Sequence, residues 1–129
     1  NQDFSRKKRL LTASQFKIVF ESPEDKFFAN GLLILIRNNN STFPRLGLVI
    51  GKKNIKLSVE RNRIKRQIRE SFRTNQQHLN GLDVVIIARR GLGKLNNKEL
   101  IIQINKLWRR IMTQQSNKLP ITNLENSYA

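Results

Sequence analysis

The residues with the clearest chemical potential are six basic side chains within residues 61–73, five of which are arginines. The planar guanidinium of arginine presents N–H donors in a fork that matches phosphate oxygens, and it also stacks on nucleobases. A run of charge usually marks a solvated helix face, but such a face mixes opposite charges four residues apart. Here Glu70 is the only acid within the run. The stretch therefore predicts a surface that binds a polyanion.

Residues suited to catalysis are scarce in the rest of the chain, which has no cysteine, one histidine and nine acids. The lack of cysteine excludes disulfides, thiol chemistry and cysteine-based zinc sites. The acids form no spaced cluster that suits Mg²⁺, and His78 lies in a predicted turn without a nucleophile beside it. We therefore expect no catalytic residue and no metal site in the protein, which is better equipped as a binding module than as an enzyme on its own.

The overall charge restricts the class of partner. A net charge of +16 over 129 residues indicates nucleic acid, an anionic membrane surface or an acidic protein. The longest apolar run, residues 32–36, is too short to span a bilayer, and no apolar segment typical of a secretory signal follows the basic N-terminus. We expect a cytoplasmic protein with one domain over residues 1–116, including a basic arm over residues 1–10, and a disordered tail over residues 117–129.

Three helices are predicted to position these side chains. Within the basic stretch Ile64, Ile68 and Phe72 recur at helical spacing with the upstream Leu57, and we expect Ser58 to cap that helix. An earlier helix over residues 12–21 is indicated by a capping box at its start and a proline after its end. A last helix should begin at residue 96 or 97. Its buried stripe is expected to contain Leu100, Ile104, Leu107 and Ile111, widened by Ile101, Trp108 and Met112.

Strands are predicted between these helices. Residues 27–37 and 82–88 are apolar with little alternation, which is typical of strands buried on both faces. The dipeptide Asn30-Gly31 interrupts the first of them and indicates a bulge or bend. Residues 45–51 predict a further strand, which we expect to pair antiparallel with the first. The chain should thus form an α+β sandwich, a single domain in which helices pack on a small sheet.

A pair of aromatic residues in the first helix allows two interpretations. Phe16 and Phe20 lie four residues apart and so share one face of that helix. Their spacing alone favours a place in the core. The alternative is that an edge of the pair is exposed and that unpaired bases stack on it.

The motif Arg61-Asn62-Arg63-Ile64-Lys65-Arg66, with Arg69 after it, resembles the Arg-Asn-Arg signature of the protein subunit of bacterial ribonuclease P. The likeness extends over roughly residues 6 to 112. The flanking stretches that resemble the same family are residues 12–20, 45–54, 82–90 and 107–110.

This resemblance implies a ribonucleoprotein that removes the 5′ leader from precursor tRNA, an endoribonuclease whose RNA subunit and Mg²⁺ ions carry out the hydrolysis. The protein alone is then expected to be inactive. Its implied partners are the catalytic RNA subunit and precursor tRNA, with no membrane and no protein partner. The implied fold is a four-stranded mixed sheet in the order α-β-β-β-α-β-α with a left-handed β–α–β crossover, which general rules for crossovers would not predict.

The resemblance also implies two sets of contacts with RNA. The residues expected to bind the catalytic RNA are Arg61, Asn62, Arg63, Lys65, Arg66 and Arg69. Those expected to bind the precursor-tRNA leader are Phe16, Phe20, Phe28, Lys52, Lys53, Arg89 and Arg90. The second set shifts the expectation for the phenylalanine pair from the core toward partial exposure.

Two other functions are compatible with a basic protein of this size. A general RNA-binding structural protein, such as a ribosomal component, has the same composition and is not separated from the first function by charge alone. A DNA-binding regulator with a basic helix in the major groove would need a zipper or a dimer. The turn at Asn80-Gly81 ends the helical stretch, which argues against that second alternative.

Overall fold

The computed structural model describes residues 10–128, and the side chains of residues 10–116 among them. The basic arm is therefore outside the described residues apart from Leu10. The main elements are α2 (Ala13–Glu21), β1 (Asp25–Ala29), β2 (Leu32–Asn38), β3 (Arg45–Val49), α3 (Ser58–Asn75), β4 (Leu82–Ala88) and α4 (Asn97–Tyr128). Two short 3₁₀ helices, η1 (Gln76–His78) and η2 (Leu92–Lys94), flank β4. The α+β class and the order of elements are confirmed.

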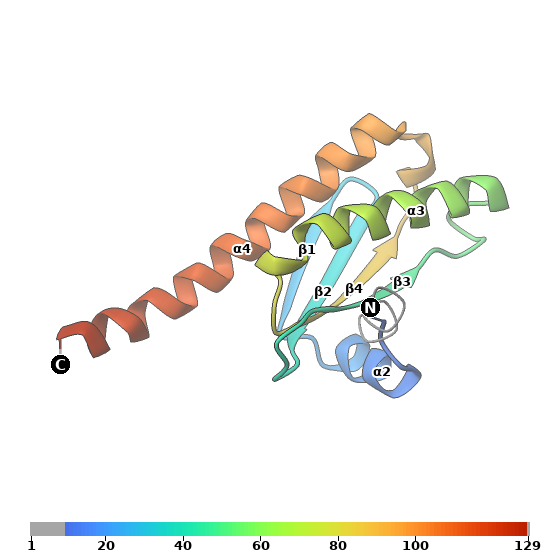
Figure 1. Cartoon of the computed structure of the whole chain (residues 1–129). Coiled ribbons are helices and arrows are strands. Elements are labelled where there is room, and N and C mark those ends of the chain that lie inside the picture. Colours follow the sequence, from blue (N-terminus) through green and yellow to red (C-terminus); the bar gives the residue numbers. More distant parts are fainter. Residues whose placement is uncertain (1–9, 129) are drawn as a thin grey trace.

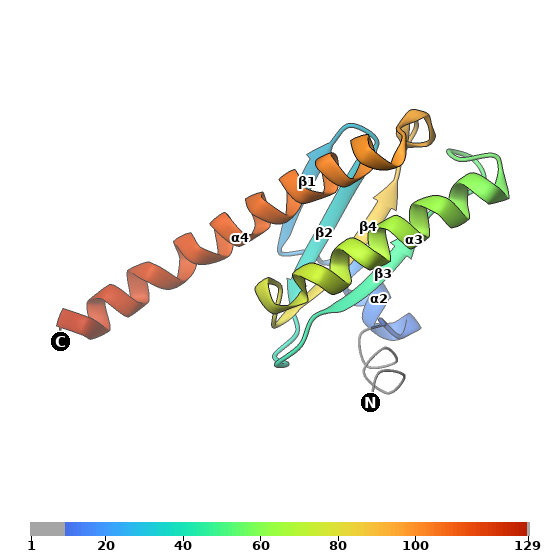
Figure 2. The same ribbon diagram turned by 45° about the horizontal axis from the view of Figure 1, so that its top comes forward.

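The four strands form one mixed sheet in the order β1-β2-β4-β3 (Figure 1). Strand β4 pairs antiparallel with β2 and parallel with β3. The expected antiparallel pairing of residues 45–51 with residues 27–37 is therefore wrong, because β4 separates β3 from β2. Helix α3 returns the chain to the other end of the sheet, which is what a parallel neighbour requires. In Figure 2 this helix lies in front of the sheet and the chain passes leftward from β3 to β4, which makes the crossover left-handed.

The dipeptide Asn30-Gly31 forms the turn of a β1–β2 hairpin, not a bulge in one strand. Gly31 has a φ of +76°, a region that other residues rarely adopt. A Cβ on Gly31 would lie 2.9 Å from the backbone of Leu92. The turn is thus held close to η2, and glycine satisfies both the backbone conformation and the close approach.

Helices cover the two faces of the sheet unequally. Helices α3 and α4 lie on one face and the short α2 lies on the other (Figures 1 and 2). The main core lies under α3 and α4, where Trp108 is 1% exposed and its Nε1 donates to Ser71 Oγ at 2.8 Å. A smaller cluster under α2 contains Val19, Leu35 and Val85.

Two helix ends differ from the sequence-based expectations. Helix α3 has Leu57 as its N-cap, and Ser58 is already its first helical residue. Leu57 is 63% exposed and does not join the core, because a capping residue lies before the helical repeat that buries Ile64 and Ile68.

Helix α4 begins with a reciprocal capping box in which the backbone N–H groups of Asn96 and Glu99 each donate to the other's side chain, at 2.9 and 2.8 Å. It continues to Tyr128 and so runs into residues 117–129, for which the sequence predicts a disordered tail. No glycine or proline occurs from residue 97 to 119, and nothing in that stretch breaks the helix. No helix in the described part of the chain is both long and apolar enough to cross a membrane.

Candidate nucleic-acid interface

The outer surface of α3 carries the cations that the sequence singled out. Ile64, Ile68 and Phe72 are buried against the sheet, as their spacing predicts. Three cations of the same helix, Lys65, Arg66 and Arg69, have no hydrogen bond or ion pair with any described residue. Arg66 and Arg69 are exposed, and Lys65 is half-buried. Their charges are therefore available to an anionic partner.

The two arginines of the Arg-Asn-Arg motif differ from these three cations, because both form hydrogen bonds within the protein. Arg61 Nη1 donates to the carbonyl oxygens of Ile55 and Lys56, each at 2.8 Å. Arg63 Nη2 lies 2.7 Å from a carboxylate oxygen of Glu60 and 2.9 Å from the Leu95 carbonyl. Arg61 thus holds the loop before α3, and Arg63 holds the segment that precedes α4. The sequence pattern did not reveal either role.

Ion pairing removes only part of the positive charge on α3. Arg73 pairs with Glu70 three residues earlier, and both side chains are 60% exposed. The hydrogen bond from Arg73 lowers the pKa of the Glu70 carboxyl, and the same contact raises the pKa of the Arg73 guanidinium. Exposed pairs of this kind add little stability. With Arg63 and Arg73 paired, the unpartnered cations still form one group on the helix.

The opposite face of the sheet carries the aromatic pair. The rings of Phe16 and Phe20 stack with centroids 6.0 Å apart and an interplanar angle of 13°. Phe16 is half-buried over Gly47, where an added Cβ would lie 2.9 Å from its ring. Phe20 is 53% exposed, so the core placement favoured by spacing is wrong for this residue. The pair is partly open to solvent, as the resemblance implied.

Beside α2 an apolar row crosses all four strands. The strand register aligns Phe28 with Leu33, Leu33 with Ile87 and Ile87 with Val49. Phe28 is 54% exposed, and the other three are partly buried around the smaller cluster. Alternation places their side chains on the face that α2 covers incompletely. Sequence reasoning found Phe28 in this row and missed its three neighbours, because their alignment depends on strand register.

A basic pocket of about 590 Å³ lies at the end of the sheet, and its lining includes Ala29, the residue after Phe28 of that row. Lys53, Arg89 and Arg90 supply its cations. The rest of its lining is Ala29, Asn30, Gly31 and Asn54, so none of the described residues that line it is acidic. Lys52 is exposed and does not line the pocket. The structure thus brings three of the four predicted cations together at the end of the strand that carries the exposed Phe28. Cations and an exposed ring together suit single-stranded nucleic acid.

Comparison with known proteins identifies the family to which this architecture belongs. The sequence profile of the family Ribonuclease P matches residues 4–112. The chain belongs to the ribonuclease P protein family. The ribonuclease P protein components of Pseudomonas fluorescens (strain Pf0-1) and Pseudomonas putida (strain KT2440) are both 60% identical over 111 residues, covering 86% of this chain and 84% of each relative. Membership makes the chain a component of ribonuclease P, a ribonucleoprotein nuclease of tRNA processing.

Solved structures of ribonuclease P proteins share the fold. A mutant of the Staphylococcus aureus RNase P protein superposes with a TM-score of 0.78 at 22% identity, covering 85% of this chain and 93% of that protein. The Thermotoga maritima RNase P protein gives a TM-score of 0.68 at 26% identity, covering 78% of this chain and 96% of that protein. The four-stranded sheet and its three helices are therefore the fold of this family.

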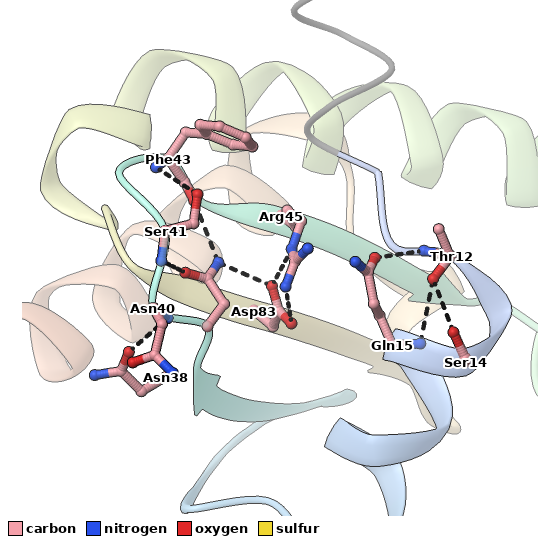
Figure 3. A network of polar contacts seen from close by, with 10 residues as sticks. Thr12, Ser14, Gln15, Asn38, Asn40, Ser41, Phe43, Arg45 and Asp83 are labelled. Carbon is pink, nitrogen blue, oxygen red and sulfur yellow. Dashed lines mark hydrogen bonds and ion pairs between the residues drawn. The ribbon is translucent and has the colours of Figure 1, made fainter.

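A buried ion pair lies at the other end of the α2 face of this ribonuclease P protein. Figure 3 shows the guanidinium of Arg45 facing the carboxylate of Asp83, with bonds of 2.7 and 2.9 Å to its two oxygens. Asn39 Nδ2 donates to the same carboxylate at 2.9 Å, and Asp83 is 5% exposed. The pair neutralises Arg45. Sequence reasoning missed it, although one acid in an apolar strand is a signal of a buried partner.

The described residues do not fit a metal ion. They contain no group of three or more histidine, cysteine or acidic side chains that could hold one. The pocket at the end of the sheet is lined by cations, which would repel Mg²⁺. What this face can bind is an anion, and no catalytic step follows from its geometry.

Proposed function

We propose that this ribonuclease P component binds the catalytic RNA subunit through α3 and the 5′ leader of precursor tRNA across the α2 face. The observation that carries the proposal is the pairing of exposed aromatic rings with a cationic pocket. Phe20 and Phe28 are each more than half exposed, and the pocket formed by Lys53, Arg89 and Arg90 is lined also by Ala29, the residue after Phe28.

The leader would be held by two kinds of contact. Its bases stack on the exposed rings, which tolerates any sequence because every base has a π-face. Its phosphates lie against Lys53, Arg89 and Arg90, whose charge favours a polyanion. The apolar row to which Phe28 belongs would give the bases a surface that excludes water.

The cations of α3 would bind the RNA subunit on the other side of the sheet. Lys65, Arg66 and Arg69 have no partner among the described residues, so binding phosphate breaks no contact within the protein. One protein that holds both RNAs raises the effective concentration of each for the other. In this proposal hydrolysis belongs to the RNA subunit and its Mg²⁺ ions, and the protein contributes substrate affinity.

Cleavage of precursor tRNA tests the proposal directly. The catalytic RNA is assayed at low Mg²⁺ with and without the protein, and the protein is also assayed with no catalytic RNA. We expect strong stimulation in the first comparison and no cleavage in the second. The second arm is needed because one solved Staphylococcus aureus relative is described as a mutant with defective mRNA degradation activity. Lack of stimulation would eliminate the proposal, and cleavage by the protein alone would contradict its inactivity.

The remaining alternative is a general RNA-binding protein, which the net charge of +16 also suits. The two functions differ in what they recognise. A leader-binding subunit gives the holoenzyme a higher affinity for precursor tRNA than for mature tRNA. Equal affinities for the two RNAs would favour the general RNA-binding function.

A further inference from the structure

The loop between β3 and α3 carries Lys53 to the basic pocket, and contacts of Ile55, Asn54 and Arg61 fix its position. Within the loop, the backbone N–H of Ile55 donates to the Gly51 carbonyl at 3.0 Å. The side chain of Ile55 is 4% exposed and anchors that end of the loop in the core. The two other contacts come from Asn54 and Arg61.

Asn54 bridges the loop to the neighbouring strand. Its Nδ2 donates to the carbonyl oxygen of Ala88 at 3.0 Å. Ala88 is the last residue of β4 and directly precedes Arg89, while Asn54 directly follows Lys53. This single hydrogen bond therefore joins the two walls of the pocket at the residues next to its cations.

Arg61 holds the same loop from the side of α3. Its Nη1 donates to the carbonyls of Ile55 and Lys56, each at 2.8 Å, from the first turn of α3. The β1–β2 turn forms a third wall of the pocket. It is held by another bond, in which the backbone N–H of Arg89 donates to the Gly31 carbonyl at 2.8 Å. The loop is thus tied to both α3 and β4.

The pocket needs such ties because its cations repel one another. Lys53, Arg89 and Arg90 line one pocket, and none of the described residues that line it is acidic. Without a bound anion, a free loop would move Lys53 away from the two arginines to reduce this repulsion. Hydrogen bonds that hold the loop in place keep the pocket ready for a phosphate before it arrives.

We infer that Asn54 and Arg61 are positioning residues, which hold Lys53 against Arg89 and Arg90 so that the leader pocket is formed in the free protein. The inference rests on the proposed binding of the leader. It assigns Asn54 a role that neither its residue type nor the basic motif suggested. Arg61, which was expected to contact the catalytic RNA, then supports the leader site by holding this loop.

The test is a double-mutant cycle between Asn54→Ala and Lys53→Ala in the reconstituted holoenzyme. The quantity measured is the ratio of affinities for precursor tRNA with a long leader and with a one-nucleotide leader. We expect Asn54→Ala to reduce this ratio about three- to tenfold, the worth of one hydrogen bond that orients a charge. It should raise KM without changing kcat, and it should have no further effect when Lys53 is already alanine.

Three comparisons exclude a merely structural effect. Asn75→Ala removes a chemically matched bond, from a half-buried amide to the Ser71 carbonyl at 2.8 Å, and should leave the ratio unchanged. Asn54→Gln keeps the donor and should restore part of the loss. Arg61→Ala in the same cycle with Lys53→Ala should also show coupling. This variant keeps the test decisive if Asn54→Ala does not fold.

The remaining results distinguish failure of the leader assignment from failure of the positioning role. If the unmodified holoenzyme shows no dependence on leader length, the leader assignment itself fails and this inference fails with it. If Lys53→Ala reduces the ratio but Asn54→Ala does not, the leader site stands and the positioning role is refuted. Losses that simply add in the cycle refute it as well, because they mean that Asn54 does not act through Lys53.

Discussion

Arg66 and Arg63 lie three residues apart on α3, yet their replacement should have different consequences. Arg66 is exposed and has no partner among the described residues. Arg63 donates to Glu60, the Leu95 carbonyl and Asn97. We therefore expect Arg66→Gln to weaken binding of the catalytic RNA and Arg63→Gln to weaken the fold.

The magnitudes follow from the number of unpartnered cations. Each phosphate contact contributes about 0.7–0.9 to the slope of log affinity against log salt, so Lys65, Arg66 and Arg69 together should give a slope of about −2 to −3. Arg66→Gln should reduce the slope by about 0.7–0.9 and leave the free energy of unfolding nearly unchanged. Arg63→Gln should leave the slope unchanged and lower the free energy of unfolding by about 1–3 kcal/mol, because the partly buried acceptors on Glu60 and Leu95 lose their donor.

Two measurements on each variant decide between these outcomes. Affinity for the catalytic RNA is measured at several KCl concentrations with Mg²⁺ held constant, and the free protein is unfolded in urea. The reasoning is refuted if both variants reduce the salt slope equally, or if Arg66→Gln leaves the slope unchanged. Either result would mean that bonding within the free protein does not determine which cations of α3 reach phosphate.

Three further predictions concern single sites. Asp83→Ala should lower the free energy of unfolding by about 3–5 kcal/mol in thermal or urea unfolding, because it leaves the charge of Arg45 without its partner; a loss below 1 kcal/mol would show that water compensates it. Phe20→Ala should weaken leader binding by about 1–3 kcal/mol, with little effect on the melting temperature of a residue that is 53% exposed. Unchanged leader affinity in that folded variant would exclude stacking on this ring. Gly31→Ala should destabilise the protein by at least about 1–2 kcal/mol in the same unfolding assays, because of its positive φ and its contact with Leu92; unchanged stability would show that the hairpin turn rearranges freely.

The sequence was informative where local periodicity decides the structure. The spacing of Ile64, Ile68 and Phe72 predicted the buried side of α3, and the capping box at Thr12 and Gln15 is present in the structure. Strand pairing was not predictable in this way, because the partner of β3 depends on contacts with a strand that follows 18 residues of helix. The same holds for the apolar row of the α2 face, whose members come from all four strands.

In the candidate site, the sequence predicted which polar residues gather but not which partners they bond to. The resemblance named Lys53, Arg89 and Arg90, and the structure places them around one pocket. It did not show that Arg61 bonds to backbone carbonyls, because every residue has a carbonyl and no sequence pattern marks the one that is used. The partner of Asp83 was equally hidden, since Arg45 lies 38 residues away in the chain.

The two helical layers on opposite sides of the sheet have a consequence for turnover. In the proposed arrangement the catalytic RNA binds outside α3, while the leader lies on the α2 face with the sheet between them (Figure 1). Precursor tRNA can then bind and the cleaved leader can dissociate without weakening the contact between the protein and the catalytic RNA. The protein would thus act as a spacer that stays attached through many rounds of processing, and only its outward side needs to exchange ligands.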